Sequence, residues 1–389
     1  MFHACPNPDC AGHQAGGLFP EPMPCVLCGT PLAEARIVVD PVSSSGGART
    51  EEEQALVEGY PYVMALPYSR MLQEPDGRNR LELLAYTLQN ALKYMGLLVV
   101  GEYHASDLRL PKLNDLFRQN LYQPSFGNWN AFLREGISAL EAEGHTWRFP
   151  EIGEAYRKVE TAKKAKMYPT ETAYTDDQGL QAFRKVDGTA IGTLINFRNK
   201  YLGHGVPLNR EQCADLYARH KPILDDFLQA LSFAPDLTLV RAERTHLFRL
   251  TGTAPGEVDG RQPTASEREK VWVEHSDGRR MELMPFFILP GQVAGVGAES
   301  GVLVYEQFTG GKRLVFHGPD SSHGESVGEV LERLKSMIRL KEEEPPIPAE
   351  GMTEAVFSHR LAQWNESVMA GLHRERKVIP NLYQPRAEA

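Results

Sequence analysis

The chain has 389 residues, of which 42% are hydrophobic and 24% are charged, with a formal net charge of −9 at pH 7. This composition is normal for a soluble globular protein, and the acidic balance argues against non-specific coating of nucleic acid, which needs concentrated Lys and Arg. The length predicts two or three domains. No basic region followed by an apolar core opens the chain, and no apolar run approaches the length of a transmembrane helix. We therefore expect a cytoplasmic protein without a membrane partner.

Cysteines crowd into the start of the chain, where four of the five form two close pairs, Cys5 with Cys10 and Cys25 with Cys28. Two such pairs are the ligand set of a tetrahedral Zn²⁺ site, and the binding of the metal would supply the folding free energy of so small a module. Residues 1–39 are similar to a zinc ribbon, although the first spacing of four residues is longer than the usual two. His3 or His13 can replace one thiol. Unligated cysteines or a redox pair are the alternatives. The Glu of a zinc deaminase is absent, so we predict structural Zn²⁺.

Residues 40–78 have the composition of a linker, most clearly in the stretch rich in Ser, Gly and Glu over 40–53. From Asn79 onward, apolar residues recur at spacings of three and four. This spacing predicts helices over about 79–100, 111–122, 126–144, 151–166, 188–202 and 209–233. We therefore expect an all-helical bundle in a domain that covers residues 79–234.

After Pro235, short β-branched or aromatic segments alternate with Gly, Pro and Asp turns, which predicts an antiparallel β unit over about 236–318. A helix near 325–341 closes this β-rich α+β domain, assigned to 235–342. Residues 343–389 are predicted to form a linker, an amphipathic helix and a tail. The whole chain is thus predicted to be a multidomain α+β protein.

The stretch FRNKYLGHG ends the predicted helix 188–202 and contains an arginine, an asparagine and a histidine close together. Apolar residues at helical spacing share a face with Arg198, and a guanidinium on such a face is costly unless it is paired or opens onto a cleft. Gly203 can adopt the left-handed conformation that ends a helix, which would turn His204 back toward Arg198 and Asn199. An arginine can neutralise phosphate charge and a histidine can move a proton, which suits RNA cleavage without a metal.

The bundle with Arg198, Asn199 and His204 resembles the HEPN superfamily, whose signature is R-x(4–6)-H with a polar residue after the arginine. The resemblance covers about residues 79–233. It implies a homodimer that joins two motifs in one cleft, and a metal-independent endoribonuclease that leaves a 2′,3′-cyclic phosphate in RNA. Many members are toxins or act in antiviral defence in bacteria. Arg198 would then stabilise phosphate charge, His204 would handle protons and Asn199 would support both. The acidic region 145–186 has no place in the family pattern.

Other functions also fit these residues. The chain can instead be a non-catalytic zinc-ribbon/HEPN adaptor that binds a partner protein or a nucleotide, with Arg198 paired to a bundle carboxylate and His204 capping a helix. A third hypothesis makes Tyr201 the modified residue of an antitoxin-like partner. The basic stretch 157–166 fits either an RNA path or a solvated helix face. The end of the chain, KVIPNLYQPRAEA, is similar to the entry to a STAND-type ATPase, so a sensor ATPase is a candidate partner.

Overall fold

The computed structural model describes residues 49–121, 124–161, 163, 165–175, 181–203, 207–293, 301–309, 313–320, 323–326 and 353–356, with short segments among the first 34. The chain divides into two compact units, Met1–Arg49 and Thr50–Ala389. In the first unit, the described residues include a three-stranded antiparallel sheet in the order β2 (Leu18–Phe19), β1 (His3–Ala4) and β3 (Ala33–Glu34).

The second unit opens with two helices where the sequence predicted a linker over 40–78. They are α2 (Glu51–Gly59) and α3 (Tyr62–Gln73). Thr50 and Glu53 form a capping box, which starts α2 directly after the Ser- and Gly-rich stretch. Helix α3 is buried along most of its length and contains Pro67. The linker prediction was therefore wrong beyond Arg49, because a helix that is apolar on nearly every side carries no clear period in its sequence.

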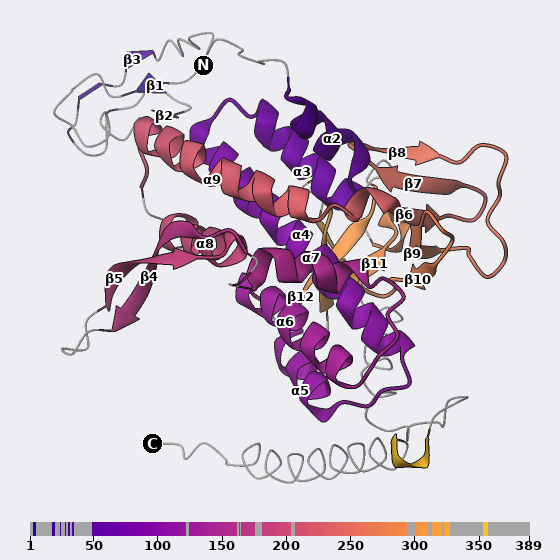
Figure 1. Ribbon diagram of the computed structural model, residues 1–389. Coiled ribbons are helices and arrows are strands. Elements are labelled where there is room, and N and C mark those ends of the chain that lie inside the picture. The colour runs from indigo at the N-terminus through magenta and orange to yellow at the C-terminus, as the bar shows by residue number, and fades with distance from the viewer. Residues whose placement is uncertain are drawn as a thin grey trace, which may run out of the picture. The chain divides into compact units, whose positions relative to one another are not determined.

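The predicted bundle helices are present. They are α4 (Gly77–Ala105), α5 (Pro111–Asn120), α6 (Phe126–Ala142), α7 (Glu151–Glu160), α8 (Ala190–Phe197) and α9 (Arg210–Ala230). Side chains that accept hydrogen bonds from the first turn cap four of them, at Asp76, Ser125, Thr189 and Asn209. Helix α4 lies at the centre and packs against α3, α6 and α9 (Figure 1).

Helix α4 departs from the expectation that no segment could span a membrane. In the part of the chain that the structure describes, it is long and apolar enough to do so, but 83% of that stretch is buried inside the protein. Such burial is typical of the core helix of a soluble protein. Its side chains, such as Leu88 and Leu92, are fully covered by neighbouring helices and strands.

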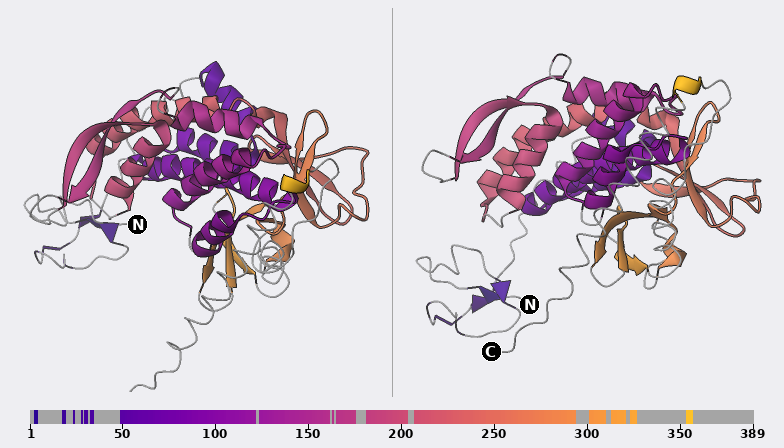
Figure 2. Two further views of the ribbon diagram at one scale, coloured as in Figure 1. Left: turned by 60° about the horizontal axis from the view of Figure 1, so that its bottom comes forward. Right: turned by 90° about the horizontal axis from the view of Figure 1, so that it is seen from below.

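The region between α7 and α8 contains a β-hairpin, so the prediction of an all-helical bundle was wrong there. Strands β4 (Tyr168–Thr175) and β5 (Gln181–Gly188) pair antiparallel along their whole length, and β4 contacts α8. Threonine and tyrosine at alternate positions of β4 favour a strand. The hairpin reaches away from the helices at the end of the bundle opposite the larger sheets (Figures 1 and 2).

The predicted antiparallel β unit is confirmed but consists of two sheets. The first has the order β10-β9-β6-β7-β8, with β6 (Leu237–Ala242), β7 (Leu247–Thr251), β8 (Ala254–Glu257), β9 (Lys270–His275) and β10 (Arg280–Glu282). The second has the order β11-β12-β13-β14, with β11 (Phe287–Ile288), β12 (Leu303–Thr309), β13 (Arg313–His317) and β14 (His323–Ser326). The predicted helix near 325–341 lies outside the described residues except at its start, where Glu325 and Ser326 end strand β14 instead. Most of 343–389 also lies outside the described residues.

Helices and sheets share one hydrophobic core. Leu88 of α4 belongs to the same buried cluster as Leu239 of β6, Val273 of β9, Ile288 of β11 and Phe316 of β13. The bundle and the β-rich region are therefore one compact unit and not two domains that meet at residue 235. The α+β class predicted from the sequence is confirmed.

Candidate active-site cleft

Helix α8 does not end at Phe197 but widens into a single π-helical turn, Arg198–Leu202. The backbone N–H of Gly203 donates to the carbonyl of Arg198 (2.8 Å), five residues earlier, as a π turn requires. Such turns are rare in proteins overall, but those that occur often lie at functional sites. The predicted left-handed end at Gly203 was wrong, because this residue has φ −72° and continues the right-handed path. His204 lies outside the described residues.

The Arg198 side chain is half-buried and packs against an aromatic ring. Its Cζ atom lies 5.2 Å from the ring centroid of Phe126, and its Nη1 donates to the side-chain oxygen of the exposed Asn199 (3.3 Å). A Cβ atom on Gly203 would lie 3.0 Å from Nη1, so the glycine leaves room for the guanidinium. Among the described residues, no carboxylate pairs with Arg198, and the side chain opens onto a cleft.

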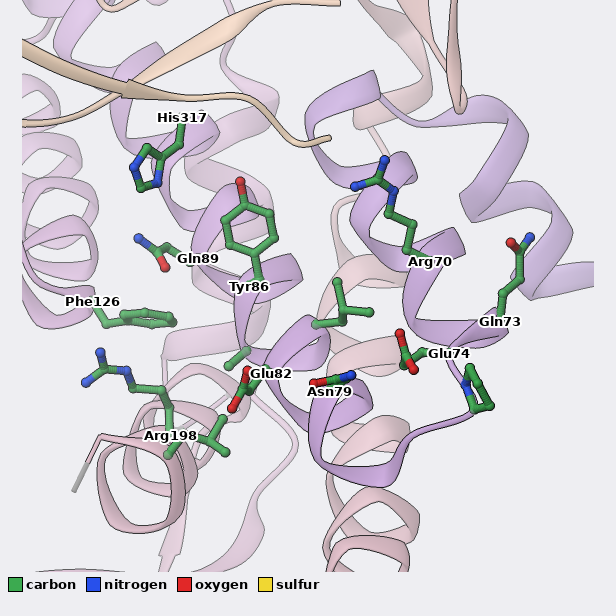
Figure 3. A pocket seen from close by; sticks show the side chains of 14 residues that line it. Arg70, Gln73, Glu74, Asn79, Glu82, Tyr86, Gln89, Phe126, Arg198 and His317 are labelled. Atoms are coloured by element: carbon green, nitrogen blue, oxygen red, sulfur yellow. The ribbon is translucent and has the colours of Figure 1, made fainter. Parts of the chain in front are cut away.

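This cleft has a volume of about 860 Å³, which is in the range of small-molecule sites. Segments far apart in sequence line it: the end of α3, one face of α4, the first residue of α6, the π turn and the last residue of β13 (Figure 3). Arg198 and Phe126 lie on one side of the cleft, and Arg70 and Glu74 lie on the other, with Tyr86 between them. In this cleft Arg198, which the motif predicted, meets residues that no motif indicated, whereas Asn199 is not among the lining residues.

Charges of both signs line the cleft. Arg70 is half-buried and forms no hydrogen bond or ion pair with the described residues. The Glu74 carboxylate accepts a hydrogen bond from the backbone N–H of Asp76 (2.9 Å) but forms no ion pair within the described part of the chain, since Arg80 donates to the Glu74 carbonyl instead. Glu82 differs, because Arg78 pairs with it at 2.9 Å. Two arginines and one glutamate are thus available to a ligand.

The wall between α4 and the second sheet is held by buried polar contacts. The Tyr86 hydroxyl donates to the carbonyl of Gly318 (2.7 Å), and burial raises the pKa of Tyr86 to about 12. Glu306 of β12 accepts a hydrogen bond from Gln89 (3.1 Å) and pairs with the buried ammonium of Lys93. These contacts fix β12 and β13, and hence His317, against α4.

The opposite face of the π turn borders a second cavity of about 240 Å³, lined by Lys200, Tyr201 and His220 among others. Lys200 pairs with Glu171 of β4. The His220 ring stacks on Phe197 with centroids 4.3 Å apart, and Nδ1 donates to the carbonyl of Leu216 (2.8 Å). Burial lowers the pKa of His220 below its ordinary value of 6.5, so at neutral pH the ring is uncharged and Nε2 carries the lone pair.

The described residues of the basic stretch 157–166 do not line the large cleft. Arg157 pairs with Glu141, and Lys166 pairs with Asp226 at 2.6 Å. Helix α7 ends at Glu160, inside this stretch. Both cations are engaged with carboxylates, which favours the solvated-face hypothesis over an RNA path.

Only one of the four predicted zinc ligands falls among the described residues. Cys28 is exposed and its thiol donates to the Thr30 hydroxyl (3.2 Å). Pro24 and Pro31 form an antiparallel bridge, and Cys28 lies between them in the sequence. The described residues hold no group of three or more His, Cys, Asp or Glu placed for a metal.

The chain matches no protein-family model, no curated protein and no solved structure. Function is therefore argued from the chemistry of the cleft and of the sequence motif.

Proposed function

We propose that the chain is a metal-independent endoribonuclease of the HEPN type, active as a cytoplasmic homodimer in a bacterial defence or stress response. One observation carries the proposal. Arg198 stands on a π turn six residues before His204, has no carboxylate partner among the described residues, and faces a cleft of about 860 Å³. An arginine that is half-buried beside an aromatic ring and left without a counter-charge is suited to bind a phosphate.

The reaction needs a base, an acid and a stabiliser of negative charge. The 2′-hydroxyl of RNA loses its proton and attacks the adjacent phosphorus, and the leaving 5′-oxygen takes up a proton, which gives a 2′,3′-cyclic phosphate. His204 exchanges these protons, because its pKa is ordinarily near neutrality. Arg198 neutralises the charge that grows on the phosphate oxygens. Asn199 holds the guanidinium through the contact at 3.3 Å.

The first unit has a separate, structural role in this proposal. Cys5, Cys10, Cys25 and Cys28 hold a Zn²⁺ ion that stabilises the small sheet and takes no part in the cleavage. The alternative function is a non-catalytic adaptor that binds a partner protein or a nucleotide. Glu74 supports this alternative, because its carboxylate lines the cleft and would repel the phosphates of an RNA backbone.

Cleavage of total RNA by the purified full chain in EDTA tests the proposal. We expect cleavage by the wild type and a loss of about 100-fold or more in Arg198→Ala and His204→Ala. Arg134→Ala is a matched control, because Arg134 lies on α6, is 58% exposed and does not line the cleft. Equal activity in all four proteins, with folding verified by circular dichroism, would exclude this site. Binding of a nucleotide without cleavage would favour the adaptor.

A further inference from the structure

Arg70 and Glu74 form an unusual pair in the cleft. They are four residues apart, at the last turn of α3 and at its C-cap, a spacing at which opposite charges normally pair. Within the described residues they form no ion pair with each other or with any other side chain. Both line the cleft, and their side chains reach into it from the same side (Figure 3). A ligand that contacts both must present hydrogen-bond acceptors and donors next to each other.

Guanine has this arrangement. Its O6 and N7 atoms accept two parallel hydrogen bonds from an arginine, which is a common specific contact in nucleic-acid recognition. Its N1–H and N2–H₂ groups, on the adjoining edge, donate two parallel hydrogen bonds to a carboxylate. Adenine presents a donor where guanine has O6, and the pyrimidines lack the N7 acceptor. Arg70 and Glu74 together therefore select guanine among the four bases.

The phosphate of such a nucleotide has a partner on the opposite side of the cleft. Arg198 lies there, with its guanidinium over Phe126. Glu82 is not assigned to the ligand, because Arg78 already pairs with it. We propose that the cleft binds one guanine nucleotide, with the base held by Arg70 and Glu74 and the phosphate held by Arg198. This inference rests on the proposed ribonuclease function, which identifies the ligand as a nucleotide of RNA.

Equilibrium binding of nucleotides to the full chain tests the inference. The probes are the 3′-monophosphates of guanosine, inosine, 7-deazaguanosine and adenosine. Inosine lacks the N2 amino group, which would donate a hydrogen bond to Glu74. The base of 7-deazaguanosine lacks the N7 atom, which would accept a hydrogen bond from Arg70. We expect the guanosine nucleotide to bind about tenfold or more tightly than the adenosine nucleotide. Comparable affinities for guanosine and adenosine would overturn the inference.

Variants separate the three contacts. Glu74→Gln should abolish the preference for guanosine over inosine, and Arg70→Ala should abolish the preference over 7-deazaguanosine, because alanine offers no donor to N7. Arg198→Ala should weaken all four nucleotides equally. Arg134→Ala and Glu135→Gln change the same residue types outside the cleft and should alter nothing. If the preferences survive in Glu74→Gln and Arg70→Ala, with thermal midpoints unchanged, the assignment is overturned.

A short RNA with a single guanosine shows whether the bound nucleotide comes from RNA or is free. It also tests the ribonuclease activity and the guanine site separately. Cleavage next to that guanosine, lost in Glu74→Gln, supports a guanosine of RNA as the ligand. Selective binding of the mononucleotide, with no competition by this RNA and no cleavage, supports the same guanine site for a free nucleotide and refutes the ribonuclease. Cleavage without preference for guanosine refutes the guanine site and leaves the ribonuclease intact.

Discussion

Replacing Glu306 by alanine should destabilise the fold strongly, because it would leave a buried cation without a counter-charge. Lys93 is 1% exposed in its side chain and pairs with Glu306, which is 18% exposed. Lys93 comes from α4 and Glu306 from β12, so the pair joins the helical and β parts of the same core. The imidazole of His317 also lies near Glu306, with its Nδ1 atom 3.8 Å from the carboxylate.

The magnitude follows from the cost of an unpaired charge. Breaking a buried ion pair by removing one partner costs about 3–5 kcal/mol, whereas an exposed pair contributes about 0–1 kcal/mol. Glu306→Ala should therefore lower the free energy of unfolding by about 3–5 kcal/mol. Glu135→Ala, which removes a partner of Arg134 that is 52% exposed, should cost less than about 1 kcal/mol. Lys93→Met combined with Glu306→Leu should recover most of the loss, since no charge remains buried.

The loss of unfolding free energy in Glu306→Ala should also depend on pH in a defined direction. Burial lowers the pKa of Lys93 below its ordinary value of 10.5, and Glu306 partly opposes this shift. A lowered pKa means that the unfolded chain binds more protons than the folded chain between the two pKa values, so stability rises with pH in that window. Without Glu306 the folded-state pKa falls further and the window widens. The deficit of Glu306→Ala should therefore shrink as the pH rises from 7 toward 10.5.

Urea unfolding of the three variants at pH 7 and pH 9.5, followed by far-ultraviolet circular dichroism, measures these differences. The reasoning about a buried charge would be refuted by a loss below about 1 kcal/mol at pH 7 or by a deficit that does not change with pH.

Three further predictions follow from local geometry and from the cysteines. Gly203→Ala should leave the thermal midpoint unchanged but slow RNA cleavage about tenfold. The new Cβ atom would lie 3.0 Å from Nη1 of Arg198 and displace the guanidinium. An unchanged cleavage rate would contradict this. Gly136→Ala should lower the free energy of unfolding by about 1–3 kcal/mol, because the new Cβ atom would lie 2.5 Å from Cγ1 of Val99. Adding Val99→Ala should relieve that loss, which a stability measurement on the double variant would show. Native mass spectrometry should find a single Zn²⁺ per chain that Cys28→Ser releases, and a metal-free wild type would contradict the zinc site.

Local signals explain which elements the sequence revealed. The predicted helices over 126–144 and 209–233 correspond to α6 and α9 within a few residues, because apolar spacing and the caps Ser125 and Asn209 act over a single turn. Helix α3 and the β4–β5 hairpin were missed, since the first is apolar on most sides and the second interrupts a helical region. The conformation of Gly203 was predicted wrongly because glycine permits a left-handed conformation and does not require one.

The cleft was only partly predictable for a different reason. Arg198 and Asn199 stand in a short motif that can be read locally. Arg70, Glu74 and His317 join Arg198 only through long-range packing of α3 and β13 against α4, and no spacing in the sequence records that contact. His220 was missed as well, because its place behind the π turn depends on how α9 packs against α8.

The proposed ribonuclease requires that Arg198 and His204 cleave RNA through its 2′-hydroxyl without a metal. The most direct measurement is mass spectrometry of the products from a defined RNA incubated with the full chain in EDTA, beside the same RNA with 2′-deoxy substitutions and beside Arg198→Ala. We expect fragments that end in a 2′,3′-cyclic phosphate, and no fragments from the deoxy substrate or from Arg198→Ala. Fragments with 3′-hydroxyl ends, or equal cleavage of the deoxy substrate, would contradict it.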